Sequence, residues 1–188
     1  MARIYRLPDE GKSVLHVGAV IGREFRWELL KATTGLADQT LLTHLGALTE
    51  AELLYERGVL PQTTYLFKHA FTQEAAYRSL LTLRRYDLHR RVALALESLC
   101  VDRPEEYYGQ LAHHFLEAAQ GAEVDKGIDY ARRAGARAMT LAAYEEAMHF
   151  YQMALQVLTR QAPEAETQHC TLLLALGEAQ RKVGRSPQ

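Results

Sequence analysis

The spacing of apolar residues predicts three short helices near the N-terminus. They cover residues 13–21, residues 27–33 and a third segment that begins at Asp38. Gly22 and Gly35 follow the first two segments, and glycine is common just past the end of a helix. We assign Asp38 as the N-cap of the third helix, because its carboxylate can accept hydrogen bonds from the first free amides. The chain therefore opens as a cluster of helices.

The pattern then changes to a β-hairpin that runs directly into another helix. Residues 53–57 and 65–68 are β-prone, and the glycine, proline and glutamine between them supply the chain reversal. Tyr65 and Phe67 share one face of the second strand, because side chains alternate along a strand. His69 lies at the junction between this strand and the helix that follows.

The second half of the chain carries the signature of an α-helical repeat. Two helices are predicted over residues 107–119 and 124–134. Small and aromatic residues then fall at the offsets of one tetratricopeptide repeat, namely Gly135, Tyr144, Ala147, Tyr151 and Ala154. Small residues let two antiparallel helices approach closely, and tyrosines fill the gaps between them. Any Ala-rich helical hairpin would show some of these matches, so that alternative stays open.

A second repeat is predicted to begin near Leu173 and Gly177, with its partner helix beyond the end of the chain. Gly135 and Gly177 are 42 residues apart, against about 34 in a standard repeat. A longer loop around Pro163 accounts for the difference. We therefore expect the apolar face of the last helix to lack a partner, which favours either fraying after Pro163 or self-association that covers this face.

Four phrases of the chain, in this order, resemble the region after the ATPase domain in STAND-type signal-transduction ATPases: residues 7–8 (LP), 20–25 (VIGREF), 67–70 (FKHA) and 88–93 (LHRRVA). The likeness is greatest to bacterial adenylate/guanylate cyclase-linked ATPases and to large ATP-binding LuxR-type regulators. The resemblance implies a mainly α fold. Residues 1–100 would form a winged-helix domain with a small β-hairpin, and residues 101–188 antiparallel tetratricopeptide-like hairpins. The ATPase domain itself is missing, so we expect a middle segment of a larger protein.

The same resemblance gives His69 a specific role. In these families a histidine at the start of the helix after the hairpin contacts the β-phosphate of ADP in the resting state. The family motif is Met-His-Asp in the plant and animal branches, whereas this chain has Lys68, His69 and Ala70. A histidine can donate a hydrogen bond to a phosphate oxygen at neutral pH. The alternative, equally open, is a structural His69 whose imidazole ties the strand to the helix.

Composition and charge limit the classes of partner. Apolar residues make up 48% of the chain and charged residues 24%, which is typical of a globular protein. The formal net charge of −1 gives no field that attracts nucleic acid or an acidic membrane. Residues 40–53, which include most of the predicted third helix, contain no lysine or arginine. We therefore do not expect this helix to bind DNA.

The cysteines and the hydropathy pattern indicate a cytoplasmic protein. Cys100 and Cys170 lie far apart and form no Cys-x-x-Cys pair, which favours two reduced thiols. No apolar stretch approaches the roughly 20 residues that a membrane span needs. We therefore expect no membrane association.

Other apparent motifs do not predict an active site. Residues 11–13 (GKS) imitate the end of a P-loop, but Arg6 stands where its first glycine is needed. His113 with Glu117 and Glu145 with His149 are pairs at helical spacing, and two ligands do not make a zinc site. We expect no catalytic residue, metal or cofactor in this chain. ATP or ADP is implied only for the parent protein.

Residues 84–91 carry four arginines around Asp87, which we expect to pair with Arg91. An apolar stripe at helical spacing predicts the buried face of this helix: Leu88, Val92, Ala95 and Leu99. The arginines then form either a solvated surface or a basic face that docks on an acidic partner or on the ATPase domain.

These observations predict a non-catalytic regulatory and protein-interaction segment of a larger signal-transduction ATPase. Its partners would be the ATPase domain of the same parent and a protein bound by the repeat region. The parent would be linked to a nucleotide cyclase or a transcription regulator. The alternative is a free-standing helical scaffold for protein–protein interaction, and a DNA-binding winged helix is a weaker third.

Overall fold

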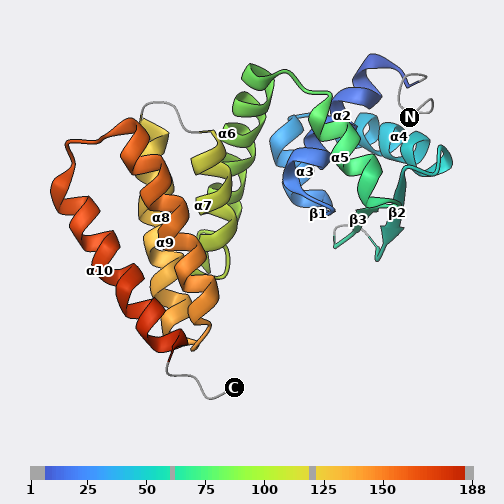
Figure 1. Cartoon of the computed structure of the whole chain (residues 1–188). Helices are drawn as coiled ribbons and strands as arrows, with labels where there is room; N and C mark the ends of the chain where they lie inside the picture. Colours follow the sequence, from blue (N-terminus) through green and yellow to red (C-terminus); the bar gives the residue numbers. More distant parts are fainter. Residues whose placement is uncertain (1–6, 60–61, 119–121, 185–188) are drawn as a thin grey trace. The chain divides into compact units, whose positions relative to one another are not determined.

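The computed structural model describes residues 7–59, 62–118 and 122–184. The contacts of the chain divide it into two compact units, residues 1–95 and residues 96–188. The described residues are mainly helical with one small antiparallel sheet, as predicted. Figure 1 shows the helices and strands with their labels.

The helices of the first unit follow the predicted order. They are α2 (Asp9–Ile21), α3 (Trp27–Thr34), α4 (Asp38–Glu50), α5 (Ala70–Arg78) and the first part of α6 (Thr82–Leu99). Gly22 and Gly35 are the residues that end α2 and α3, as predicted, and the amide of each bonds back into its helix at 3.0 and 2.9 Å. Gly35 has φ 69°, a left-handed conformation that glycine adopts at little cost.

Asp38 is not the N-cap of α4, which corrects the prediction. Ala37 occupies that position and makes no side-chain cap, while Asp38 is the first helical residue. The Asp38 carboxylate instead forms an ion pair with the ammonium group of Lys31 at 2.6 Å. It still places a negative charge in the first turn of the helix, where the helix dipole favours one.

Three strands form one antiparallel sheet in the order β1-β3-β2. They are β1 (Glu24–Arg26), β2 (Leu54–Arg57) and β3 (Thr64–Phe67). Tyr65 and Phe67 are buried on one face of β3, as the alternation predicted. The sequence did not indicate β1, whose single buried residue, Phe25, pairs with Tyr65 in the sheet and stacks on its ring at 6.0 Å.

The core of the first unit joins the sheet to the helices. Leu41, Leu45 and Leu48 recur at helical spacing on one face of α4 and are fully buried. Helix α5 is fixed to α2 by Gln73, whose side-chain amide donates to the carbonyl of Ala19 at 2.8 Å. This contact fixes the position of α5, which follows the hairpin directly.

The second unit consists of helices that lie side by side in chain order (Figure 1). They are the short 3-10 helix η1 (Pro104–Glu106), α7 (Tyr108–Glu117), α8 (Ala122–Thr140), α9 (Tyr144–Gln161) and α10 (Glu166–Val183). Tyr151, Ala147 and Ala154 are buried between α9 and its neighbours, as the spacing predicted. Tyr144 is only half-buried, because it is the first residue of α9 and borders the turn from α8.

One position of the predicted apolar stripe in α6 is wrong. Leu88 and Val92 are buried, but Leu99 is 49% exposed. Leu96, which is 4% exposed, is buried near the end of the helix instead. Leu99 is the last residue of α6, where the chain leaves the helix.

Candidate functional site

His69 lies at the junction between β3 and α5. It is the N-cap residue of α5 and has an extended backbone, with φ −131° and ψ 136°. Its backbone carbonyl accepts hydrogen bonds from the amides of Thr72 and Gln73 at 2.9 and 3.4 Å. The imidazole is exposed and forms no hydrogen bond to a described residue. In this structure the backbone of His69, rather than its side chain, connects the strand to the helix.

The first amides of α5 provide hydrogen-bond donors beside this imidazole. The N–H groups of Ala70 and Phe71 have no acceptor among the described residues. The positive end of the helix dipole adds to their attraction for an anion. These amides can therefore donate to an anionic oxygen, and His69 is the residue that precedes them in the chain. Phe71, on the same turn, is 82% exposed.

Lys68 is held away from this group of donors. Its ammonium group forms an ion pair with Glu52 at 3.1 Å and lies 5.4 Å from the centre of the Tyr55 ring. The hydrogen bond to Glu52 raises the pKa of Lys68 above its usual value. Glu52 has φ 56°, a left-handed conformation that is uncommon for a residue with a side chain. Lys68 is therefore bound to the turn after α4.

The other end of α5 is also anchored within the first unit. The Tyr77 hydroxyl and Nε2 of His89 are 3.0 Å apart, and Ala76 is fully buried. The Arg85 guanidinium lies 5.3 Å from the centre of the Tyr77 ring. A helix held at both ends presents its N-terminus in a fixed place, which an anion site requires.

The remaining motifs from the sequence lie on ordinary helical surfaces. Residues 11–13 are inside α2, and the amide of Lys12 bonds to the carbonyl of Pro8 at 2.9 Å. His113 and Glu117 are exposed on α7, and residues 145 and 149 are exposed on α9.

The arginines of α6 are partly engaged within the first unit. Arg84 donates to the Asp87 carboxylate at 3.0 Å, and Arg91 donates to the carbonyl of Thr33 at 2.5 Å. The predicted pair of Asp87 with Arg91 is therefore wrong. A carbonyl at the end of α3 has no amide partner within its own helix, so it is a ready acceptor for Arg91.

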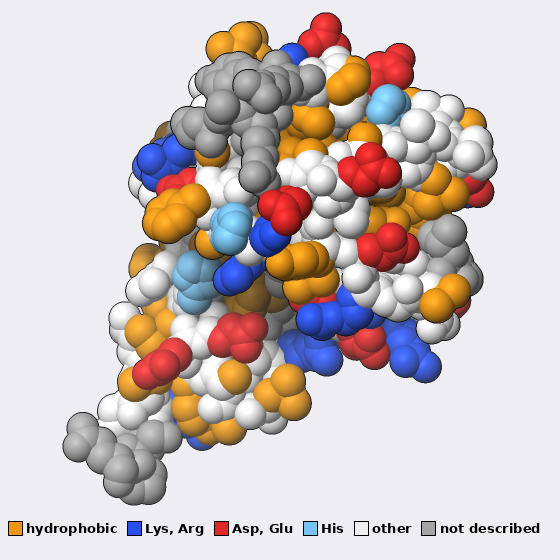
Figure 2. Space-filling view, turned by 90° about the vertical axis from the view of Figure 1, so that its right-hand side faces the viewer, with side chains coloured by type: hydrophobic (Ala, Val, Ile, Leu, Met, Phe, Trp, Pro, Cys, Tyr) orange, Lys and Arg blue, Asp and Glu red, His pale blue; other side chains and the backbone are white. Residues whose placement is uncertain are grey.

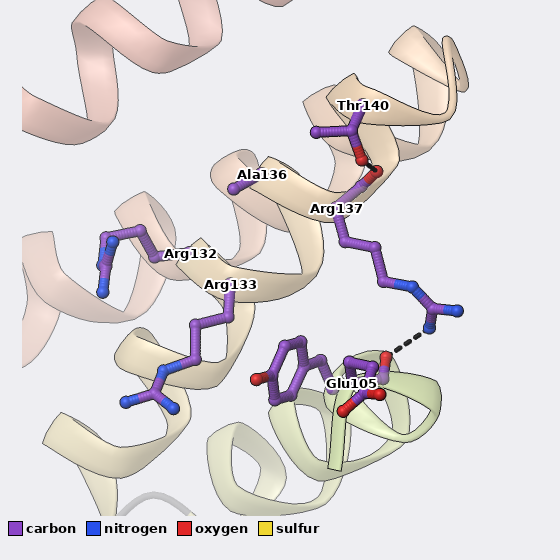
Figure 3. Close-up of a pocket in the computed structure, with 7 residues that line it drawn as sticks. Glu105, Arg132, Arg133, Ala136, Arg137 and Thr140 are labelled. Atoms are coloured by element: carbon purple, nitrogen blue, oxygen red, sulfur yellow. Dashed lines mark hydrogen bonds between the residues drawn. The ribbon is translucent and has the colours of Figure 1, made fainter. Parts of the chain in front are cut away.

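A groove in the second unit was not found from the sequence. It has a volume of about 390 Å³ and lies between one face of α8 and the η1–α7 segment (Figure 3). Its lining residues are Glu105, Tyr108, Arg132, Arg133, Ala136, Arg137 and Thr140. We call it the arginine groove. The sequence shows two arginines four residues apart, Arg133 and Arg137. It does not show that Glu105 and Tyr108 lie opposite them, because the folding of the chain brings these segments together.

The surface in Figure 2 mixes charges of both signs with apolar side chains. Lysine and arginine lie among acidic residues on this face instead of forming one continuous positive surface. Within the part of the chain that the structure describes, no helix is long and apolar enough to cross a lipid bilayer.

Comparison with known proteins finds a relative without an established role. The chain is 29% identical over 166 residues to an uncharacterized protein of Rhizobium meliloti. The match covers 88% of this chain but only 16% of that protein, so the chain spans less than a fifth of its relative. No protein-family profile matches the chain, and no solved structure matches it significantly.

Proposed function

We propose that this chain is a non-catalytic regulatory and protein-interaction segment of a larger signal-transduction ATPase. Residues 1–100 would act as a winged-helix domain and residues 101–188 as a tetratricopeptide-like region. Helices α2 to α4, followed by the β2–β3 hairpin and then by further helices, support this assignment. The segment would couple the nucleotide state of the ATPase domain to a partner-binding surface.

The observation that carries the proposal is the exposed imidazole of His69 at the N-terminus of α5. The amides of Ala70 and Phe71 follow it in the chain, so the helix end offers two backbone N–H donors to an anion, and the imidazole would add a third. The β-phosphate of ADP suits such donors, since it carries several anionic oxygens. In the resting state this contact would hold the domain against the nucleotide, and its loss would release the domain.

ADP release from the full-length parent tests this role. His69→Ala should release ADP faster than wild type, because one donor to the phosphate is lost, and should shift the population toward the open state. His149→Ala, an exposed histidine on α9, is the matched control and should leave release unchanged. Equal release of ADP from wild type and a folded His69→Ala variant would show that the imidazole does not contact the nucleotide.

The chain alone should neither bind ATP tightly nor hydrolyse it. Its sequence has neither a P-loop to hold the phosphates nor a Walker-B acid to hold Mg²⁺. Titration of the purified chain with a labelled ATP analogue and Mg²⁺ measures this directly. Micromolar affinity or measurable turnover would contradict the assignment as a non-catalytic segment.

A free-standing interaction scaffold is the second candidate. The exposed leucines of α10 favour it, because Leu173 is 55% exposed and Leu174 is 77% exposed. Reading the coding region upstream decides between the two proposals. A P-loop and a Walker-B strand there would support the regulatory segment, and their absence would support the scaffold.

A further inference from the structure

The arginine groove has the form of a binding site for an anionic chain. One wall is the face of α8 that carries Arg133 and Arg137, and the other wall is formed by Glu105 and Tyr108 (Figure 3). Ala136 lies between the arginines in the sequence and contributes only a methyl group, which leaves room above the helix.

The guanidinium groups of this groove are held in place by their neighbours. Asp129 accepts from Arg132 at 2.8 Å and from Arg133 at 2.7 Å. The Arg133 guanidinium also lies 5.9 Å from the ring centres of both Tyr108 and Tyr130. The hydrogen bond to Asp129, assisted by one with Tyr108, raises the pKa of Arg133. An arginine that is already ordered loses less side-chain entropy when it binds a ligand.

These contacts leave hydrogen-bond donors unused. Each guanidinium has five N–H donors. Arg137 uses one of them for the backbone carbonyl of Glu105, and the side chains of Arg132 and Arg133 remain about half exposed. Planar forks of this kind bind carboxylates through two parallel hydrogen bonds.

Two arginines of the groove offer separate positive charges to a ligand. Arg133 and Arg137 are four residues apart on α8, and their side chains leave the helix in different directions, so their guanidinium groups lie at two separate points of the groove (Figure 3). An extended peptide with carboxylates on alternate residues presents them on one side at intervals of about 6.6 Å and can reach both points. We propose that the arginine groove binds an extended acidic protein segment whose carboxylates pair with these two arginines.

Nucleic acid is a poorer occupant of the same groove. Strong binding to a phosphate backbone needs many cations in a row, whereas this groove has three arginines, and two of them already pair with Asp129. The chain as a whole has a net charge of −1. A short acidic peptide needs only the local match of two or three charges.

Fluorescence anisotropy with labelled peptides and the whole chain tests the proposal. The probe is a short peptide in which glutamate and serine alternate, and its control has glutamine in place of glutamate. We expect the glutamate peptide to bind at low salt, and the combined change Arg133→Gln and Arg137→Gln to weaken binding about tenfold or more. Arg160→Gln, an exposed arginine on α9, should leave binding unchanged.

Two further measurements complete the test. Arg137→Lys keeps the charge but loses the fork, so it should weaken binding less than the double change; it also serves if the double variant does not fold. A thymidine oligonucleotide tests the phosphate alternative. Unchanged binding in the arginine variants, equal binding of the glutamine peptide, or tighter binding of the oligonucleotide through the same arginines would each overturn the proposal.

Discussion

Tyr151 on α9 lies directly against Gly135 on α8. A Cβ atom at residue 135 would lie 2.7 Å from Cζ of the tyrosine ring, closer than real contacts allow. Tyr151 is 4% exposed, and its burial raises the pKa of its hydroxyl. Gly177 on α10, in contrast, has open space where its Cβ would stand. The two glycines therefore provide a matched pair of sites, one filled by an aromatic ring and one empty.

Gly135→Ala should lower the free energy of unfolding by up to about 2 kcal/mol. Alanine gains about 1 kcal/mol of helix propensity, but overpacking against the Tyr151 ring costs about 1–3 kcal/mol. Gly177→Ala meets no neighbour, so it should raise the free energy of unfolding by about 0.5–1 kcal/mol. Urea unfolding of both variants measures this difference. Equal stabilisation by the two changes would show that α8 and α9 do not approach as closely as described.

Ala142→Gly should stabilise the turn between α8 and α9. Ala142 has φ 57°, and the amides of Ala142 and Ala143 bond back into the end of α8 at 3.2 and 2.9 Å. Glycine removes the strain of the left-handed backbone and should add about 0.5–1 kcal/mol after its greater unfolded-state entropy is counted. Ala136→Gly, inside α8, should instead lose about 1 kcal/mol. A midpoint of thermal unfolding that shifted in the same direction for both variants would contradict the left-handed conformation of Ala142.

Stability should fall at alkaline pH because of Tyr65. Burial, followed by the charge of Glu56 and a hydrogen bond to it, raises the pKa of Tyr65 to about 12. Tyrosine in the unfolded chain loses its proton near pH 10. Between about pH 10 and about pH 12 the folded state therefore binds more protons than the unfolded state. The stabilisation is present below about pH 10 and declines as pH rises toward about 12, by on the order of 2 kcal/mol.

Tyr65→Phe tests this assignment, since it keeps the buried ring and removes the hydroxyl. Urea unfolding at about pH 8 and about pH 11 should show a smaller loss of stability in the variant than in wild type. The other tyrosines contribute equally to the pH dependence of stability in wild type and variant. The same pH dependence in both would mean that Tyr65 does not hold its proton as described.

The isolated chain should self-associate through the outer face of α10. Leu173 and Leu174 are exposed, while Leu172, next to them, is buried against α9. Replacing residues 173 and 174 together by glutamine should shift the chain toward monomer in analytical ultracentrifugation, with stability changed by less than about 0.5 kcal/mol. Leu141→Gln changes an exposed leucine that precedes α9 and should leave association unaltered. A wild-type chain that stays monomeric at high concentration would refute this expectation.

Local signals predicted much of the fold. The apolar periodicity of α4, the glycine stops after α2 and α3 and the β2–β3 hairpin depend on neighbouring residues, and the sequence shows them directly. The burial of Tyr151 and Ala154 followed from spacing for the same reason. The position of His69 at the strand–helix junction was also predicted, because the spacing of apolar residues changes there from that of a strand to that of a helix.

Long-range contacts explain what the sequence did not show. β1 has three residues, too few for a pattern, and becomes a strand only because Phe25 meets Tyr65 in the fold. The Asp38 carboxylate forms an ion pair with Lys31 instead of accepting hydrogen bonds from the amides of its own helix. The arginine groove requires η1 and α8 to meet, although Arg137 and Glu105 are far apart in the sequence.

The pairing of β1 with β3 gives the two units different folding kinetics. Glu24 pairs with Leu66, so this edge of the sheet forms only after a loop of about forty residues has closed, which is slow. Residues 96–188 are held mainly by contacts between consecutive helices, and such local contacts form quickly. In refolding from urea, helical signal from the second unit should return first, and burial of Trp27, which follows β1 and donates its amide to Thr63, should come later.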